Sequence, residues 1–389
     1  MTQAYDVIIV GGGIVGLTAA LAMAERGFSV AVIDAGSLDG ELKATERVYA
    51  INHASKVLFE QLGVWALIDE SRISPYQHMH VWDSTTTKFI DFDSRVIASQ
   101  ELGVILEESA IKKALLQKIV AEQNITCFPG TRARRVLNDS EVVTVSCDDT
   151  IWKGRLLMIA DGAKSPTRNL LNVPITSWPY HQHALVATVN TEKAHLQTAY
   201  QVFNPDGPLA FLPLVDNHQC SIVWSTTRAR ALTLLSLAEE EFNHELGKAS
   251  AHKLGNVRLK SSRHQFPLIM RHTQRYVGKN WLLLGDAAHT IHPLAGLGLN
   301  VGLADVAAWL SCLAASNQQF TSKALGAYQR ERKYAVWQII ALMSGLKTLF
   351  ANPLPPIAAL RGFGLELCNR ITPLKRLLIE QAAGKPLRR

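Results

Sequence analysis

The sequence has few cysteines, and the five that it has are scattered: Cys127, Cys147, Cys220, Cys312 and Cys368. Their number is odd, and no two of them form a Cys-x-x-Cys pair. This argues against a disulfide framework and against a metal site, so we expect no metal ion. A reducing compartment such as the cytoplasm fits this usage.

The chain also lacks an N-terminal targeting pattern. No basic segment with an apolar core precedes the first predicted strand, so we expect no signal peptide and a cytoplasmic location. Hydrophobic residues make up 48% and charged residues 19% of the 389 residues. This composition is typical of a globular enzyme that is long enough for two domains.

An excess of positive charge is absent from most of the chain. Residues 332–389 carry ten Lys or Arg and two acidic residues, whereas the other 331 residues carry 30 basic and 31 acidic groups. The net charge of +7 therefore belongs to the C-terminal segment. Because no basic-aromatic interleaving accompanies it, we expect no nucleic-acid partner.

That basic segment is also apolar. Residues Ala335–Leu346 are uncharged, but the run is too short to span a bilayer and Lys347 closes it. Two interpretations stay open. The segment is either a helical packing layer with solvated Lys and Arg, or a basic helical surface that lies peripherally on the inner face of an anionic membrane.

Glycines are concentrated where the chain makes its first predicted turn. Gly11, Gly13 and Gly16 follow the apolar run Tyr5–Val10 and precede the helical pattern Leu17–Ala24. The first glycine permits a tight turn, the second lets the backbone approach a pyrophosphate, and the third lets the helix pack on the strand. Backbone amides and the helix dipole at such a turn hold an anion.

An acidic residue follows the next predicted strand at a suitable distance. The strand Ser29–Ile33 ends at Asp34, which lies 18 positions after Gly16. A carboxylate there can accept hydrogen bonds from the hydroxyls of the adenosine ribose. The alternative is an ordinary glycine-rich turn with a surface aspartate, which the context and the spacing disfavour. The sequence therefore predicts that the chain binds the ADP part of a dinucleotide.

A second glycine-rich motif follows the apolar strand Trp281–Leu284. Gly285 and Asp286 come first, and the stretch Pro293–Asn300 leads into a predicted helix. The carboxylate can bind a polyol chain, the glycines allow backbone approach to a flat ring, and the helix N-terminus stabilises negative charge on reduced flavin. A nicotinamide cofactor does not need this second approach, so we predict FAD. The predicted environment of the flavin ring is Pro293, Gly296, Leu297, Gly298, Leu299 and Asn300.

A third motif lies between these two. Asp161, Gly162 and Arg168 follow the predicted strand Arg155–Ala160. A carboxylate, a turn glycine and an arginine at this spacing suit the pyrophosphate region of the cofactor. Alone, the motif is equally well an ordinary Asp-Gly turn, and its place between the other two motifs favours the cofactor.

The periodicity of the rest predicts an α/β fold. Helical patterns cover Asn52–Leu62, Ser109–Glu122, Ser236–Leu246 and Leu299–Ala315, and alternating strands dominate the stretch after Pro174. We expect a Rossmann-like FAD-binding domain with an inserted, mostly antiparallel β-sheet substrate domain and a C-terminal helical segment. The expected ranges are 1–75, 101–175 and 275–331 for the FAD-binding domain, 76–100 and 176–274 for the substrate domain, and 332–389 for the basic helical segment.

Together, Gly11–Gly16, Asp161–Arg168 and Gly285–Asn300 resemble the three signatures of class A flavoprotein monooxygenases. Within them, His289–Gly296 resembles the ubiquinone-biosynthesis hydroxylase family, and Glu46–Ile51 is similar to the arginine segment of that family. The resemblance covers nearly the whole chain. It includes the tail segments Leu360–Leu365, Pro373–Arg376 and Ala383-Gly384.

The resemblance implies a role for each motif residue. The implied FAD contacts are Gly11, Gly13 and Gly16 at the pyrophosphate, Asp34 at the adenosine ribose, Arg47 near the flavin or its ribityl chain, Asp161 near the pyrophosphate and the nicotinamide approach, Gly285 and Asp286 at the ribityl or pyrophosphate region, and Pro293 with Gly296 to Asn300 along the ring. The family usually has glutamine where this chain has Leu297. Leucine keeps the backbone route but removes a polar group near the flavin.

The resemblance also implies a reaction. NADH or NADPH reduces FAD, oxygen forms a C4a-hydroperoxyflavin, and the distal oxygen is transferred to the ring of a polyprenylated phenol or quinone precursor of ubiquinone. A multiprotein quinone-biosynthesis complex is the implied partner. The protein must orient the substrate and exclude water, so we assign no catalytic base. Two alternatives stay open: a flavin-dependent reductase or dehydrogenase of a lipid-like substrate, and a FAD-containing assembly component.

Five further side chains have two interpretations each. His289 and His292 could relay protons, although turn residues more often bond the main chain. Trp224, Phe211 and Phe203 could form a wall for a prenylated aromatic substrate, although aromatic residues on strands are more often core.

Overall fold

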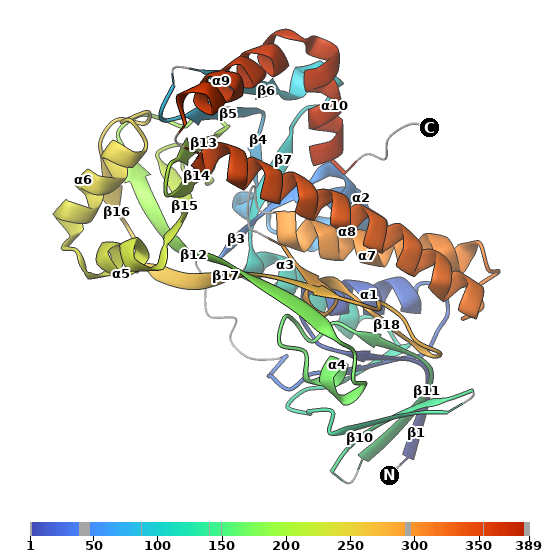
Figure 1. Ribbon diagram of the computed structural model, residues 1–389. Helices are drawn as coiled ribbons and strands as arrows, with labels where there is room; N and C mark the ends of the chain where they lie inside the picture. Colours follow the sequence, from blue (N-terminus) through green and yellow to red (C-terminus); the bar gives the residue numbers. More distant parts are fainter. Residues whose placement is uncertain are drawn as a thin grey trace.

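The computed structural model describes residues 2–38, 47–86, 88–139, 141–148, 150–291, 297–352 and 354–384. Two large sheets lie at different ends of the molecule, and the C-terminal helices run along one side of both (Figure 1). This is the α/β architecture that the sequence predicts, with an inserted antiparallel sheet and a helical C-terminus.

The first sheet has seven strands and is built around β1 and β11. The order is β8-β2-β1-β11-β10-β9, and β18 pairs with the end of β11. β1 runs parallel to both β2 and β11, and β18 runs parallel to β11. The strands are β1 (Thr2–Val10), β2 (Val30–Ile33), β8 (Ile125–Phe128), β9 (Arg135–Asn138), β10 (Val143–Cys147), β11 (Thr150–Ile159) and β18 (Trp281–Leu283).

The second sheet has nine strands and is mostly antiparallel. The order is β19-β17-β12-β15-β14-β13-β5-β6, with β16 beside β12, and only β13 and β5 pair in parallel. The strands are β5 (His78–Asp83), β6 (Phe89–Asp93), β12 (Ile175–Thr191), β13 (Thr198–Asn204), β14 (Gly207–Pro213), β15 (Gln219–Thr227), β16 (Val257–Leu259), β17 (His264–Thr273) and β19 (His289–Thr290). A small third sheet joins β3 (Val48–Asn52), β7 (Gly103–Glu107) and β4 (Ser74–Tyr76).

The helices cover the sheets in groups. α1 and α7 pack into the core of the first sheet, and α5 and α6 cover one face of the second (Figure 1). The helices are α1 (Ile14–Ala24), α2 (His53–Gln61), α3 (Glu108–Val120), α4 (Pro166–Leu170), α5 (Arg228–Ser236), α6 (Glu239–Ala249), α7 (Leu297–Ala314), α8 (Ser322–Ala351), α9 (Pro355–Arg370) and α10 (Thr372–Ala382). Short 3-10 helices are η1 (Trp65–Leu67), η2 (Glu70–Arg72), η3 (Ser94–Ile97) and η4 (Gly285–Ala287).

The two faces of the second sheet have different neighbours. Phe211 and Trp224 belong to the cluster under α5 and α6, together with the partly buried Trp82. Leu212, the next residue after Phe211, packs instead with Ala50 and Ile105 of the third sheet. Because side chains alternate along a strand, the third sheet lies on the face opposite α5 and α6.

Two sequence predictions differ in detail from the helices of the structure. The predicted helix Ser236–Leu246 corresponds to α6, which starts at Glu239, and the preceding helix α5 was not predicted. Three glutamates in the first turn of α6 favour a new helix N-terminus there. The predicted domain boundary at residue 332 lies within α8, where the buried Arg332 bonds Asp305 of α7.

The C-terminal helices pack on the edge of the second sheet. Arg361 of α9 is buried and its Nε donates to Asp83 of β5 at 2.6 Å. Phe350, at the end of α8, stacks on Phe203 of β13 with 3.9 Å between ring centroids. The tail is therefore a packing layer on its inner side. In the part of the chain that the structure describes, none of the helices is long and apolar enough to cross a membrane.

Candidate functional site

Four parallel strands of the first sheet end at the same level. In register, Val10 of β1 lies beside Ile33 of β2 and Ile159 of β11, and Ile159 lies beside Leu283 of β18. The glycine turn, Asp34 and the two later motifs begin within two residues of these ends. The fold therefore brings all three motifs to one edge of the sheet, where ligands of parallel α/β sheets bind.

The glycines of the first turn have two different surroundings. At Gly11, whose φ is +114°, a Cβ would lie 2.3 Å from the carbonyl oxygen of Ala160, and at Gly16 it would lie 1.9 Å from that of Gly11. Both positions exclude a side chain because the turn, α1 and β11 touch. At Gly13, the N-cap of α1, a Cβ would meet nothing within 4 Å. The open side of the turn is therefore at the helix N-terminus, which favours an anion.

Asp34 is fixed at the end of β2 by two backbone amides. Gly12 N donates to Oδ2 at 2.5 Å, and Gly36 N donates to Oδ1 at 2.7 Å. Each carboxylate oxygen can accept a second hydrogen bond, so the bound amides leave capacity for hydroxyl donors. Asp34 is half-buried and accessible, as the assignment to a ribose requires.

The carboxylate of Asp161 accepts hydrogen bonds from its own turn. Its Oδ1 accepts from Ser165 Oγ and its Oδ2 accepts from Thr167 N at 3.0 Å, which caps the start of α4. Arg168 is buried, and its Nη1 donates to the carbonyl oxygen of Ala287 at 2.9 Å. The middle motif thus shapes a loop and ties it to the third motif. The assignment of Asp161 to the pyrophosphate stays a prediction.

The third motif lies against the first. A Cβ at Gly302 of α7 would lie 2.8 Å from Val15 Cγ2 and 3.2 Å from Gly285 Cα, so α7, α1 and the β18 turn touch. Gly298, in the first turn of α7, is the opposite case, because a Cβ there would meet nothing within 4 Å. The first turn of α1 therefore packs against the second turn of α7, and each helix has an open glycine at its start.

Asp286 lies exposed at this edge, with protein around it on most sides. The surrounding protein raises the pKa of its carboxyl above the ordinary value, and nearby His289, Arg47 and Arg271 act in the opposite direction. Arg47 lies over the ring of Tyr49 with 5.0 Å between Cζ and the centroid. Its Nε is 3.8 Å from Glu108 Oε2. Arg47 and Asp286, which the sequence assigns to neighbouring parts of the cofactor, therefore lie close enough to interact electrostatically.

Asn300 uses its side chain within the protein. Its Nδ2 donates to the carbonyl oxygen of Ala50 at 2.7 Å, and its Oδ1 accepts from Asn52 N at 3.0 Å. Leu299 is buried in the core of the first sheet. Any contact of these two residues with a flavin ring is therefore through the backbone of α7. Pro293, Gly296 and His292 lie outside the described residues.

A buried carboxylate that the sequence did not indicate holds the third motif in place. Asp305 of α7 accepts from Gly285 N at 2.8 Å, lies 2.7 Å from His289 Nε2, and accepts from Arg332 Nε of α8 at 2.6 Å. Its side chain is fully buried. His289 therefore has a carboxylate partner, which neither interpretation from the sequence included. In the sequence, the only sign of this buried ion pair is an acidic residue in one predicted helix and a basic residue in the next.

The three aromatic residues considered for a substrate wall are core residues. Phe211 and Trp224 are 1% and 2% exposed in the cluster under α5 and α6, and Phe203 stacks on α8. The first two lie on the sheet face away from the third sheet, so the core interpretation holds for them.

The described residues fit FAD. Two helix N-termini with open glycines suit phosphates and an electron-rich ring, and the carboxylates of Asp34 and Asp286 suit hydroxyl groups of ribose and ribityl. The closed contacts at Gly11 and Gly16 hold the turn that presents these amides.

Comparisons with known proteins agree with FAD as the cofactor. A family model for the FAD binding domain matches residues 4–342. The chain is 33% identical over 392 residues to the 3-demethoxyubiquinol 3-hydroxylase of Escherichia coli (strain K12), which covers 98% of this chain and 99% of that protein. It is 32% identical to the mitochondrial ubiquinone biosynthesis monooxygenase COQ6 of Drosophila melanogaster, over 99% of this chain and 91% of that one.

Solved structures share the fold. The p-nitrophenol 4-monooxygenase PnpA from Pseudomonas putida has a TM-score of 0.81 at 16% identity, with all of both chains covered. PqsL of Pseudomonas aeruginosa in complex with 2-aminobenzoylacetate has a TM-score of 0.78 at 23% identity, over 90% of this chain and 97% of that one. The chain belongs to the ubiquinone-biosynthesis hydroxylase family of class A flavoprotein monooxygenases, and it is a FAD-dependent aromatic-ring monooxygenase with NAD(P)H as its electron donor.

Proposed function

We propose that the protein hydroxylates the aromatic ring of a polyprenylated phenol or quinone precursor of ubiquinone, with O₂ and NAD(P)H. The observation that carries this proposal is the packing of the first turn of α1 against α7, with an open glycine at each helix start and with Asp34 and Asp286 at the same sheet edge. The substrate class is supported by the names of the relatives that match along nearly the whole chain.

The described residues would bind the cofactor and stabilise the negative charge on its reduced ring. Gly13 and Gly298 leave the backbone at two helix starts open to phosphate and ring atoms. The N-terminus of α7 stabilises negative charge on a reduced ring. Bound FAD supplies the oxygen activation, and the protein supplies orientation and a site shielded from water. The carboxyl of Asp286 and the guanidinium of Arg47 would lie near the ribityl chain of bound FAD.

The test is incorporation of labelled oxygen. Purified, FAD-loaded protein with NAD(P)H, ¹⁸O₂ and a prenylated phenol should yield a product that gains one ¹⁸O atom. NAD(P)H oxidation that depends on the substrate but proceeds without oxygen would instead identify a reductase or dehydrogenase. Flavin that cannot be reduced in the presence of substrate would identify an assembly component. Mass spectrometry of the quinone intermediates in a deletion strain would name the hydroxylated ring position.

We also propose the division into domains that the sequence suggests, with one change. All strands of the first sheet fall within 1–75, 101–175 and 275–331, and β5, β6 and β13 to β17 fall within 76–100 and 176–274. β12 begins one residue before its range, and β19 joins the second sheet from residues 289–290. The helical segment begins with α8 at Ser322 instead of residue 332.

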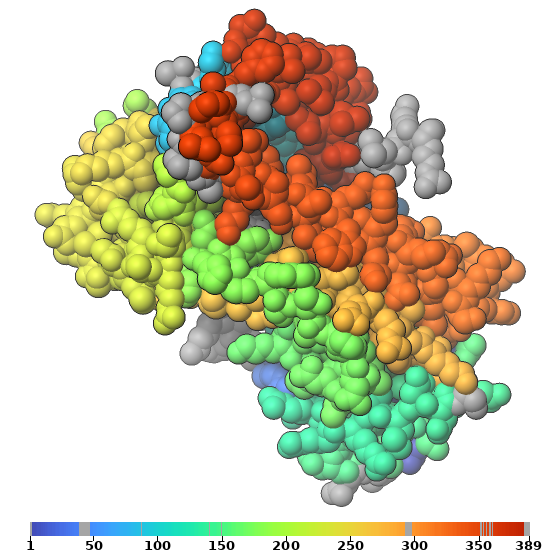
Figure 2. Space-filling view, in the orientation of Figure 1, coloured from blue at the N-terminus to red at the C-terminus, as the bar shows by residue number. Residues whose placement is uncertain are grey.

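We propose further that the exposed side of α8 lies on a membrane surface or on a partner in a quinone-biosynthesis complex. Along this side, Tyr334, Trp337 and Leu342 are 68%, 45% and 51% exposed. The other exposed positions from 334 to 348 are uncharged as well. Trp178 of β12 is also exposed and pairs with Met270, which packs on α8. Figure 2 shows α8 uncovered on this face of the molecule.

A further inference from the structure

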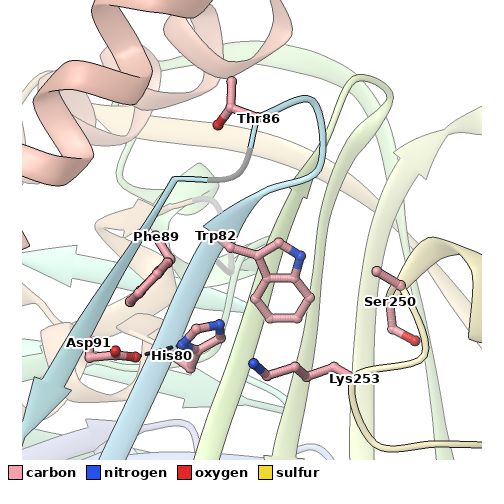
Figure 3. Close-up of a pocket in the computed structure, with 8 residues that line it drawn as sticks. His80, Trp82, Thr86, Phe89, Asp91, Ser250 and Lys253 are labelled. Carbon is pink, nitrogen blue, oxygen red and sulfur yellow. Dashed lines mark hydrogen bonds and ion pairs between the residues drawn. The ribbon is translucent and has the colours of Figure 1, made fainter.

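A hollow of about 450 Å³ lies at the β5–β6 edge of the second sheet, and its lining includes none of the residues assigned to FAD. Its size is within the usual range of small-molecule sites. The lining residues are His80, Trp82, Thr86, Phe89, Asp91, Ser250, Ala251 and Lys253. They come from the β5–β6 hairpin and from the loop that follows α6 (Figure 3).

The hollow opens on the sheet face opposite the third sheet. His80 and Trp82 alternate along β5 with Val81, which packs with Met343 and Phe350 of α8. Trp82 instead packs against the cluster under α5 and α6. A ligand in this hollow therefore does not touch the residues assigned to FAD.

Aromatic rings form one part of the lining. The ring centroid of His80 is 5.2 Å from that of Trp82 and 5.3 Å from that of Phe89. Phe89 is 41% exposed, so its ring is accessible from the hollow. Exposed aromatic faces of this kind stack on planar rings.

The polar part of the lining is arranged for a hydroxyl group. His80 Nδ1 lies 2.6 Å from Asp91 Oδ1, and this hydrogen bond lowers the pKa of Asp91 below its ordinary value. An ionised carboxylate accepts only, so Nδ1 carries the hydrogen. In the neutral ring, Nε2 is then an acceptor, and no described residue bonds it. It can take a hydrogen bond from a phenol.

The charge of the hollow favours an acid. Lys253 points its ammonium group toward His80 and Trp82 (Figure 3). It forms no ion pair with any carboxylate of the described residues. Lys375 of α10 also acts on Asp91, so two ammonium groups accompany one carboxylate. A carboxylate on the ligand would pair with Lys253 without competition from an existing ion pair.

From the aromatic faces, the His80 acceptor and the unpaired Lys253, we propose that this hollow binds a small hydroxylated aromatic acid. The ring stacks on Trp82 and Phe89, the hydroxyl donates to His80, and the carboxylate pairs with Lys253. This is a second aromatic site, separate from the place where the ring would be hydroxylated.

Four probes separate the three contacts: 4-hydroxybenzoate, benzoate, phenol and 4-hydroxycyclohexanecarboxylate. Binding to the FAD-loaded full chain is measured by calorimetry, and the flavin absorption spectrum is recorded during each titration. We expect 4-hydroxybenzoate to bind at least about tenfold more tightly than each of the others, without a change in the flavin spectrum. Equal binding of the saturated-ring probe would overturn the proposal.

Two variants locate the site. Lys253→Gln should weaken binding of 4-hydroxybenzoate about tenfold or more, whereas the matched exposed lysine variant Lys260→Gln should not change it. His80→Phe keeps a ring but removes the acceptor, so it should bind 4-hydroxybenzoate no better than benzoate. FAD content and the thermal midpoint report folding of each variant. Wild-type affinity in Lys253→Gln, or binding that perturbs the flavin in every variant, contradicts the second site.

Discussion

At the residue scale, the site depends on where a methyl group can be added and where it cannot. The glycines of the first turn are identical in sequence terms, yet Gly16 touches backbone and Gly13 faces open space. Spacing predicted both as cofactor residues. Only the structure separates the glycine that closes the turn from the glycine that leaves room for a ligand.

A matched pair of substitutions tests this difference. Gly13→Ala should fold with a thermal midpoint close to that of the wild type but retain much less FAD, because its methyl group enters the open space. Gly16→Ala should lower the stability of the protein even without FAD, because its Cβ would lie 1.9 Å from the carbonyl oxygen of Gly11. Flavin absorbance and thermal unfolding of the apoprotein measure both effects. Full flavin content in Gly13→Ala would contradict the assignment.

We expect the carboxylate of Asp286 to lower the stability of the apoprotein and to favour FAD binding. The surrounding protein raises the pKa of its carboxyl, so the charged form costs folding free energy relative to the unfolded chain. Asp286→Asn should therefore raise the midpoint of the apoprotein. Asp286→Ala should purify with much less FAD than the wild type. Thermal unfolding and the ratio of flavin to protein absorbance check the two statements, and a full yellow complement in Asp286→Ala would remove this residue from the site.

At the element scale, Asp305 joins three elements that are adjacent in space but not in sequence. It bonds the turn after β18 through Gly285, the strand β19 through His289, and α8 through Arg332. The sequence could not reveal this, because its partners lie 16 to 27 residues away and buried ion pairs have no fixed spacing. In contrast, each strand-turn-helix motif is a continuous stretch of the chain, so it could be predicted from the sequence.

Asp305→Asn should destabilise the protein by about 3–5 kcal/mol, because the buried guanidinium of Arg332 loses its counter-charge. Urea unfolding at pH 7 measures the loss. The matched double variant Asp305→Leu with Arg332→Met removes both charges and should cost less than Asp305→Asn alone. The prediction fails if the single variant is as stable as the wild type.

His272 couples β17 to α8 and should make the protein acid-sensitive. Burial lowers its pKa to about 4, and His289 and Lys333 add to the shift. The unfolded chain binds a proton near the ordinary pKa of 6.5, so stability is complete above that pH and falls as the pH drops toward 4. The loss amounts to roughly 3 kcal/mol.

The variant His272→Phe isolates this effect. His272 already lies between the rings of Trp337 and Tyr276, at centroid distances of 4.8 Å and 5.5 Å, so a phenyl ring suits the position. Its unfolding free energy should fall less between pH 7 and pH 4 than that of the wild type. Parallel pH profiles for the two proteins would exclude His272 as the cause.

At the scale of the whole molecule, the C-terminal helices have an inner side and an outer side of different character. The inner side is fixed by Arg361, Phe350 and Arg332. The outer side of α8 has no charged residue among its exposed positions from 334 to 348, and two of these are aromatic. The composition of the C-terminal segment could not decide whether its helices pack on the rest of the protein or lie on a membrane. The helices pack and still leave an apolar surface, so the two interpretations are compatible.

Charges placed on the outer side of α8 test the proposed contact. Tyr334→Glu with Leu342→Glu should reduce binding to anionic liposomes about tenfold or more, because it removes two exposed apolar side chains and adds negative charge. Val120→Glu is the matched control, since Val120 is 88% exposed on α3. Flavin content should be unchanged in both. Equal liposome binding by the three proteins would argue against a membrane role for α8.

The pairing of β11 with both β1 and β18 has a consequence for how the protein is made. β1 obtains its neighbour β11 only when residues 150–159 have been synthesised, and the third motif follows after residue 283. At roughly 5–20 residues per second, this delay lasts on the order of ten seconds or more. All three motifs can therefore bind FAD only after the third has been synthesised, and a shortage of the cofactor would leave the chain with an unoccupied sheet edge.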